Sequence, residues 1–150
     1  MTTKQSVSNF LNNKSIAVVG VSRDKKKFGY VAYKNLKDKG YKVFPVNPNV
    51  DAVDSDKCYP NLSSITENFE GVLLVIPPKQ SERVVREAYN LGIKSIWFQQ
   101  GSSSDEVIKF CEENKISVVS GECIMMFTEP VESFHKFHRW IWKLFGKLPK

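Results

Sequence analysis

The loop from Gly20 to Gly29 has the residue types and spacing of a phosphate-binding loop. It follows an apolar run over residues 16–21 and precedes a stretch with helical periodicity. Backbone N–H groups at the start of a helix have no intrahelical partner and carry the positive end of the helix dipole, so they can bind an anion. Gly20 lets backbone approach a ligand, Ser22 offers a hydroxyl, and Gly29 puts no side chain in the way. A tight turn between strand and helix, without a ligand, is the alternative.

The loop also carries positive charge of its own. Arg23 and the lysines at 25–27 lie beside the proposed phosphate site, and we take Arg23 and Lys26 as candidate contacts. The formal net charge of +6 does not add to this argument. Of the 22 basic residues, five lie between 135 and 150, where there is no acid, so the rest of the chain has 17 against 16 acidic residues. The basic excess therefore belongs to the C-terminal segment.

Apolar strands and amphipathic helices alternate along the chain. Strands are predicted over residues 16–21, 41–46, 71–76, 94–98 and 116–119. Helices are predicted over residues 29–39, 81–92 and 105–114, the second capped by Ser81, with a short helix near 63–67. Strands that alternate with helices imply right-handed crossovers and a parallel sheet covered on both faces. The sequence thus predicts an α/β fold, a Rossmann-like doubly wound parallel sheet of about five strands.

Length and composition favour one domain over residues 1–150. The chain has 150 residues, of which 41% are hydrophobic, which is enough for one buried core. No apolar run approaches the roughly 20 residues that span a bilayer, and residues 1–11 do not form a signal peptide, so we expect a cytoplasmic protein without a membrane span. Cys58, Cys111 and Cys123 are odd in number and show no C-x-x-C spacing, which favours reduced thiols over disulfides or a zinc site.

The end of the second strand argues against ordinary NAD binding. The dinucleotide pattern G-x-G-x-x-G is poorly matched after Gly20, because Lys25 occupies its third glycine position. An NAD enzyme usually has an acidic residue at the end of this strand, where this chain has Asn47 and Pro48. The prolines here and at 77–78 either form rigid walls for a flat base or only end the strands.

Five short motifs follow one another in a distinctive order. They are Gly20-Val-Ser22, Pro45-Val-Asn-Pro48, Ile76-Pro-Pro78, Trp97-Phe-Gln-Gln-Gly101 and Gly121-Glu-Cys-Ile-Met-Met126. In this order, within residues 14–126, they resemble the motifs of standalone CoA-binding domain proteins. That family is similar to the CoA-binding domain of the succinyl-CoA synthetase alpha subunit. The resemblance implies a Rossmann-like domain whose pocket binds coenzyme A.

The resemblance also implies roles for residues at the carboxyl ends of the strands. Those that would contact phosphates are Gly20, Val21, Ser22 and Gly29. Those that would border the nucleotide or line the pocket are Asn47, Pro48, Ile76 and Pro77, with Gln99 and Gly101 as further candidates. The chain departs from the family pattern at Glu122 and Phe127, which leaves two interpretations of Cys123, a group near the CoA thiol or a small buried residue.

Catalytic constellations are not evident in the sequence. The histidines His135 and His138 lie beyond the Rossmann-like region, and no G-x-S-x-G motif or Cys/His pair occurs. The sequence therefore favours a noncatalytic CoA or acyl-CoA binding protein, regulatory or redox-linked, over an enzyme.

A C-terminal amphipathic helix is predicted over residues 129–146. It has a basic face and a broad aromatic and aliphatic face. Such a helix could contact an anionic membrane or nucleic acid, or pack on the sheet or in a homodimer. We favour packing or a homodimer and expect no nucleic-acid partner, because the rest of the chain is nearly neutral. The alternative function is an interaction or scaffold protein that acts through this helix.

Overall fold

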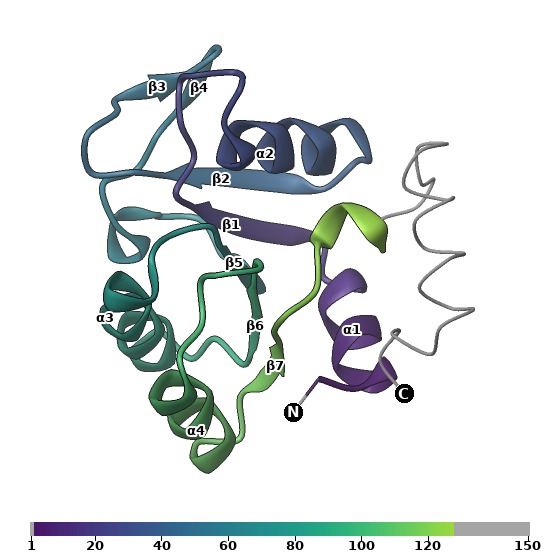
Figure 1. The fold of residues 1–150 in the computed structure, drawn as a ribbon. Coiled ribbons are helices and arrows are strands. Elements are labelled where there is room, and N and C mark those ends of the chain that lie inside the picture. The colour runs from purple at the N-terminus through teal and green to yellow at the C-terminus, as the bar shows by residue number, and fades with distance from the viewer. Residues whose placement is uncertain (1, 128–150) are drawn as a thin grey trace.

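The alternating strands and helices assemble into a five-stranded parallel sheet between two layers, as Figure 1 shows for the computed structural model. The structure describes residues 2–127. The strands of the sheet are β1 (Ser15–Val19), β2 (Lys42–Val46), β5 (Gly71–Leu74), β6 (Ser95–Phe98) and β7 (Ser117–Val119). The helices are α1 (Lys4–Leu11), α2 (Phe28–Asp38), α3 (Pro78–Asn90) and α4 (Asp105–Glu113). Short elements are β3 (Ala52–Val53), β4 (Asp56–Lys57), and the 3₁₀ helices η1 (Leu62–Ser64) and η2 (Ile124–Met126). The predicted α/β fold is confirmed, while the helix predicted over 129–146 lies outside the described residues.

The strand order is β2-β1-β5-β6-β7, so the chain reverses direction across the sheet between β1 and β5. A single parallel bridge joins Val46 of β2 to Tyr59, whose N–H donates to the Pro45 carbonyl at 2.9 Å. Tyr59 thus occupies the place of a further strand outside β2. With it, the order becomes that of a Rossmann sheet, in which ligands bind where the strand order reverses.

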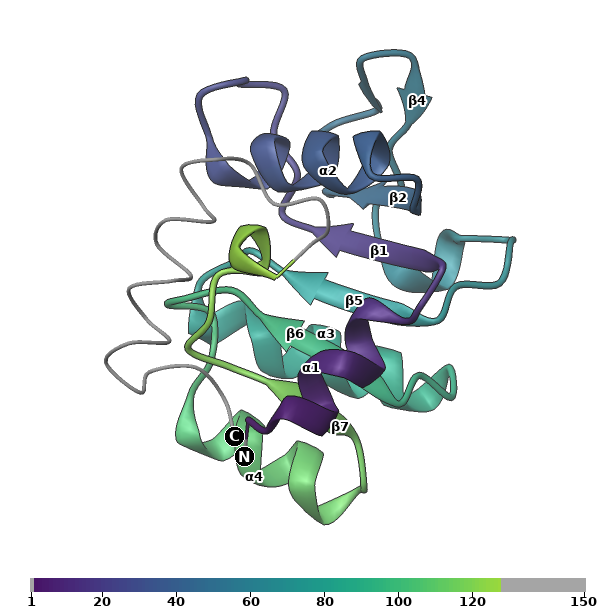
Figure 2. The ribbon, with the colours of Figure 1, turned by 90° about the vertical axis from the view of Figure 1, so that its right-hand side faces the viewer.

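Side-chain alternation along β1 divides the core into two layers. Ile16 and Val18 face the cluster that includes α1, α2 and η2, whereas Ala17 and Val19 face α3 and α4. Figure 2 shows α1 lying across one face of the sheet, with α3 behind it. Both faces of β1 are therefore buried, which explains its uninterrupted apolar sequence.

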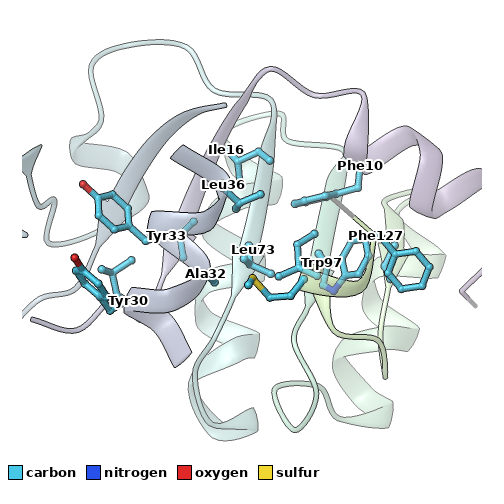
Figure 3. Packing of buried hydrophobic residues seen from close by; sticks show 14 of the residues in the cluster. Phe10, Ile16, Tyr30, Ala32, Tyr33, Leu36, Leu73, Trp97 and Phe127 are labelled. Carbon is cyan, nitrogen blue, oxygen red and sulfur yellow. The ribbon is translucent and has the colours of Figure 1, made fainter. Parts of the chain in front are cut away.

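Aromatic rings fill the first layer, as Figure 3 shows. The Phe10 ring of α1 meets Trp97 of β6 edge-on, with 5.3 Å between ring centroids, and Phe127 packs on the same indole at 5.6 Å. The indole Nε1–H donates to the backbone carbonyl of Glu122 at 3.0 Å. Trp97 therefore joins α1, the sheet and the segment after β7.

Helix α1 was not predicted from the sequence. It begins with a capping box in which the Thr3 side chain accepts from the Ser6 N–H and the Ser6 hydroxyl oxygen accepts from the Thr3 N–H. The preceding Thr2 hydroxyl exchanges two hydrogen bonds with the Ser120 backbone at the end of β7. The segment that looked merely polar therefore covers β6 and β7.

The predicted start of α3 was wrong. Proline occupies its first turn at Pro78, and Ser81 lies inside the helix, fully buried, where its hydroxyl donates to the Ser102 carbonyl at 2.5 Å. Proline is favoured there because the N–H that it lacks would have no helical partner. The short helix predicted near 63–67 is instead the single turn η1, capped by Asn61.

The hairpin of β3 and β4 is fastened to α2 by polar contacts. Lys37 donates to the Asp56 carboxylate at 2.6 Å, Tyr33 donates to the same carboxylate, and Tyr30 donates to Asp54 at 3.0 Å. The hydrogen bonds from Lys37 and Tyr33 hold the pKa of Asp56 below its ordinary value of 3.8. Burial, together with the neighbouring Asp56, raises the pKa of Tyr33.

Candidate functional site

Close backbone contact between two glycines shapes the predicted phosphate loop. Gly20 has φ +102°, and a Cβ there would lie 2.1 Å from the Val75 carbonyl oxygen. A Cβ on Gly29 would lie 2.1 Å from the Gly20 carbonyl oxygen. The end of β1 is thus packed directly against the start of α2 and the segment after β5, an arrangement that brings the helix N-terminus to the strand ends.

The start of α2 leaves backbone donors available to a ligand. Its N-cap residue Lys27 makes no side-chain capping hydrogen bond, so the first N–H groups of the helix keep their affinity for an anion. Within the loop, the Ser22 hydroxyl oxygen accepts from the Asp24 N–H at 3.0 Å, and Asp24 accepts from the Lys26 N–H at 3.0 Å. Arg23 and Lys26 are exposed beside this turn, and Val21 is fully buried beneath it.

A cavity of about 420 Å³ opens beside Gly20, where the strand order reverses. Four of the predicted site residues line it, namely Gly20, Asn47, Pro48 and Ile76. Sequence analysis missed the opposite wall, formed by Pro60, Asn61 and Leu62 and by Gln80, Arg83, Val84 and Glu87 of α3. Apolar and polar side chains share the described lining, a mixture that can hold a small ligand with an apolar part and polar edges.

Asn47 fixes the shape of this cavity through its own hydrogen bonds. Its Nδ2–H donates to the Val21 carbonyl at 2.8 Å, and its Oδ1 accepts from the Asn49 N–H at 2.8 Å. The side chain therefore ties the end of β2 to the phosphate loop. It also leaves this wall uncharged where an NAD enzyme usually has a carboxylate.

The α3 wall contains one acid and one base in different situations. The Glu87 carboxylate accepts from the Ser63 hydroxyl at 2.8 Å and from the N–H groups of Leu62 and Ser63 at 3.2 and 3.4 Å. Arg83, one turn earlier, forms no hydrogen bond or ion pair with any residue between 2 and 127. The Glu87 carboxylate thus already has hydrogen-bond donors, whereas the exposed Arg83, which lines the cavity, has no acidic partner in that range.

The remaining candidates lie near the cavity but not in its lining. Pro77 is the N-cap residue of α3. Gln99 is buried, and its Oε1 accepts from the Ile124 N–H at 3.1 Å, which anchors the segment after β7. Gly101 is exposed and has φ +85°. The structure gives Gln99 an evident structural role, whereas Pro77 and Gly101 shape the turns around the site.

The cysteines differ in accessibility. Cys58 and Cys111 are buried, Cys123 is half-buried, and all three are free. Burial raises the pKa of Cys111 to about 12, and it also raises the pKa of Cys58. Beside Cys123, burial raises the pKa of the Glu122 carboxyl, whose Oε2 has no hydrogen-bond partner among the described residues.

A larger hollow, of about 530 Å³, lies at the opposite ends of the strands, where β1 and β2 begin. Its walls come from residues 11–14, which precede β1, and residues 39–41, which precede β2, together with Phe127. Ligands of open parallel sheets bind at the carboxyl ends of the strands, so we place the site at the smaller cavity. Across residues 2–127 there is no cluster of three His, Cys, Asp or Glu side chains that could hold a metal ion. No helix in the same range is long and apolar enough to cross a membrane.

The sequence profile of the family described as "CoA binding domain" matches residues 14–129. The chain belongs to the CoA binding domain family. The match includes the phosphate loop and every residue of the cavity lining. The predicted family resemblance is thereby confirmed.

Several relatives carry the same domain. An "Acetate--CoA ligase [ADP-forming]" of Methanocaldococcus jannaschii is 32% identical over 107 residues, which is 71% of this chain but 15% of the ligase. A conserved hypothetical protein from Pyrococcus furiosus has a solved structure with 37% identity and a TM-score of 0.71, covering 74% of this chain and 96% of its own. The solved structure of a hypothetical protein from Pyrococcus horikoshii OT3 has 31% identity and a TM-score of 0.78, and the match covers 86% of this chain and 92% of that protein. The CoA binding domain thus occurs both within large ligases and as a small chain.

Proposed function

We propose that this chain binds coenzyme A or an acyl-CoA without catalysing a reaction on it. The pyrophosphate would lie on the loop from Gly20 to Gly29, and the adenosine would lie in the adjoining cavity. The observation that carries the proposal is that Gly20 belongs to both, since it ends the phosphate loop's strand and lines the cavity. A Cβ at Gly20 or Gly29 would meet backbone oxygen, so the loop has the open, closely packed form that a pyrophosphate needs.

The walls of the cavity support a nucleoside occupant. Pro48, Leu62, Ile76 and Val84 give apolar surface for a base, and Asn61 offers an amide to its polar edge. Its volume of about 420 Å³ falls in the range of small-ligand sites, about 300–1,000 Å³. The acyl or thiol end would then leave along Ile76 toward the turns after β6 and β7.

The noncatalytic part of the proposal rests on the chemistry of the side chains. Among residues 2–127, the cavity lining contains no histidine, cysteine or lysine, and the Glu87 carboxylate already accepts three hydrogen bonds. A general base or nucleophile needs a free group within hydrogen-bond reach of the reacting atom. A regulatory or redox-linked binding role, in the cytoplasm and as a homodimer, is the context we propose.

Calorimetric titration with CoA, NAD and ATP tests the binding. We expect saturable CoA binding that weakens as salt is added, because phosphate contacts are charged. The double variant Arg23→Gln with Lys26→Gln should weaken it several-fold. The matched double variant Lys34→Gln with Lys109→Gln removes the same charge from exposed helix pairs and should change little. A clear NAD signal without CoA binding would overturn the proposal.

A second assay tests the absence of catalysis. The protein is incubated with acetyl-CoA, ADP and phosphate, and released thiol is followed over time. We expect no release above the background without protein. Steady release that scales with protein concentration would show an enzyme instead. The scaffold alternative depends on residues 129–146, which lie outside the described structure, so no structural observation favours it.

A further inference from the structure

Arg83 is a positively charged residue of the cavity lining to which the proposed function assigns no part of CoA. It projects from the second turn of α3 and lines the cavity together with Gln80, Val84 and Glu87. Arg83 and Val84 lie three and four residues after Gln80 and four and three residues before Glu87, so the four share one face of the helix. Arg83 is exposed and has neither an ion pair nor a hydrogen bond within the described chain, whereas Arg86 on the same helix pairs with Glu82.

The neighbouring acid does not neutralise Arg83. Glu87 lies four residues later, at the spacing that often forms an ion pair on a helix. Its carboxylate instead accepts from the Ser63 hydroxyl and from the N–H groups of Leu62 and Ser63. Glu87 thus holds η1 in place as a wall of the cavity. The guanidinium is left for an anion that enters from outside.

The wall of the cavity that contains Asn47, across from α3, agrees with an anionic ligand. Asn47 is uncharged and its side chain is held by Val21 and Asn49, so no carboxylate stands where a ribose would lie. A carboxylate there would bind ribose hydroxyls and repel a phosphate on them, whereas an arginine nearby accommodates such a phosphate. Guanidinium binds phosphate oxygens in a bidentate manner that lysine does not reproduce.

We propose that Arg83 binds the phosphate monoester on the ribose of CoA and thereby selects this nucleotide against those that lack the group. The inference rests on the proposed function, since it assigns the adenosine end of CoA to this cavity. It names the ligand class more narrowly, as an adenine nucleotide that carries both a pyrophosphate and a separate phosphate monoester on its ribose. Dephospho-CoA, which differs only by that monoester, is therefore the matched ligand.

Affinities of CoA and dephospho-CoA for the full chain and its variants test this assignment. We expect the unchanged protein to bind CoA roughly tenfold more tightly than dephospho-CoA, as expected for a charge-assisted contact. Arg83→Gln should weaken CoA binding by about tenfold and leave dephospho-CoA within about twofold. The CoA affinity of Arg83→Lys should lie between these two values, because lysine keeps the positive charge but cannot form a bidentate contact with phosphate. Thermal unfolding verifies that each variant folds.

Arg86→Gln is the control on the same helix. Arg86 pairs with Glu82 and lies over the Phe110 ring, away from the cavity lining, so its loss should leave both affinities unchanged. If Arg83→Gln weakens both ligands by the same factor, or if the unchanged protein binds both equally, the assignment of Arg83 is wrong while CoA binding stands. If the unchanged protein binds neither ligand, both the assignment of Arg83 and the proposed CoA-binding function are wrong.

Discussion

Gly29 rests on the backbone of Gly20 so closely that a Cβ at position 29 would lie 2.1 Å from the Gly20 carbonyl oxygen. Real Cβ atoms essentially never approach another heavy atom within 3.0 Å. Since the obstructing atom belongs to backbone, no side-chain rotation relieves the contact. The first turn of α2 is therefore fixed against the end of β1, and the backbone donors of the phosphate loop are fixed with it.

Gly29→Ala should destabilise the fold, although alanine is ordinarily the better helix residue by about 0.5–1 kcal/mol. Overpacking against the Gly20 carbonyl should lower the free energy of unfolding by about 1–3 kcal/mol, as measured by urea denaturation. Gly40→Ala is the control, because it has φ +96° but no atom within 4 Å of the added Cβ. The free energy of unfolding of Gly40→Ala should be lower by about 1 kcal/mol, from backbone strain alone. A Gly29→Ala protein as stable as the original would contradict this geometry.

Phe10→Ala should reveal how much α1 contributes to the fold. Phe10 is fully buried and contacts Trp97 edge-on, so the variant should lose about 3–5 kcal/mol of unfolding free energy. Asn9→Ala, an exposed change on the same helix, should remain within about 0.5 kcal/mol. Both are measured by denaturant titration. Equal effects of the two changes would mean that α1 does not pack as described.

Asp56→Asn should make the free energy of unfolding less dependent on pH in the acidic range. The pKa of Asp56 is held below 3.8 by Lys37 first and Tyr33 second, so its ionised form stabilises the folded state. The stability difference between the original protein and the variant should be full above the unfolded pKa near 3.8 and disappear as pH falls through the lower folded value. Thermal unfolding between neutral and acidic pH measures it. A difference that grows toward acid would refute the contact.

Thiol labelling of the native protein should distinguish the cysteines. Cys123 is half-buried and should react first with a maleimide, whereas Cys111 is buried and has its pKa raised to about 12, so it should react only on unfolding. Peptide mass spectrometry over a time course identifies the labelled position. Cys111→Ser removes the slow site as a control. Labelling of Cys111 at the rate of Cys123 would show that the α4 layer opens readily.

The sequence was sufficient to predict the strands and four of the residues that line the candidate cavity. Uninterrupted apolar runs identify buried parallel strands, and residues that follow such strands must meet at one edge of the sheet, which brought Gly20, Asn47 and Ile76 together. Helix α1 was missed because it spans eight residues, and only its cap at Thr3 and the buried Phe10 distinguish it from a polar terminus.

Arg83 was missed for a geometric reason. Its distance from the phosphate loop depends on where α3 begins and which face turns toward the strand ends. Placing the start at Ser81 instead of Pro78 left Gln80 outside the helix, although Arg83, Val84 and Glu87 were inside it. A helix begun at the proline would have aligned positions 80, 83, 84 and 87 as one stripe, the signal that the sequence did contain. The role of Glu87 could not be predicted, because its partners Leu62 and Ser63 belong to the short turn η1, whose position against α3 the sequence does not indicate.

Pro45 limits how copies of this chain could associate. It lies in the edge strand β2, has no N–H to offer, and its carbonyl already accepts from Tyr59. A second sheet that approached this edge would find neither donor nor acceptor at that position, so strand-to-strand growth into continuous sheets is blocked there. Pairing of strands between copies through this edge is therefore disfavoured at Pro45 and at the neighbouring bridge between Val46 and Tyr59.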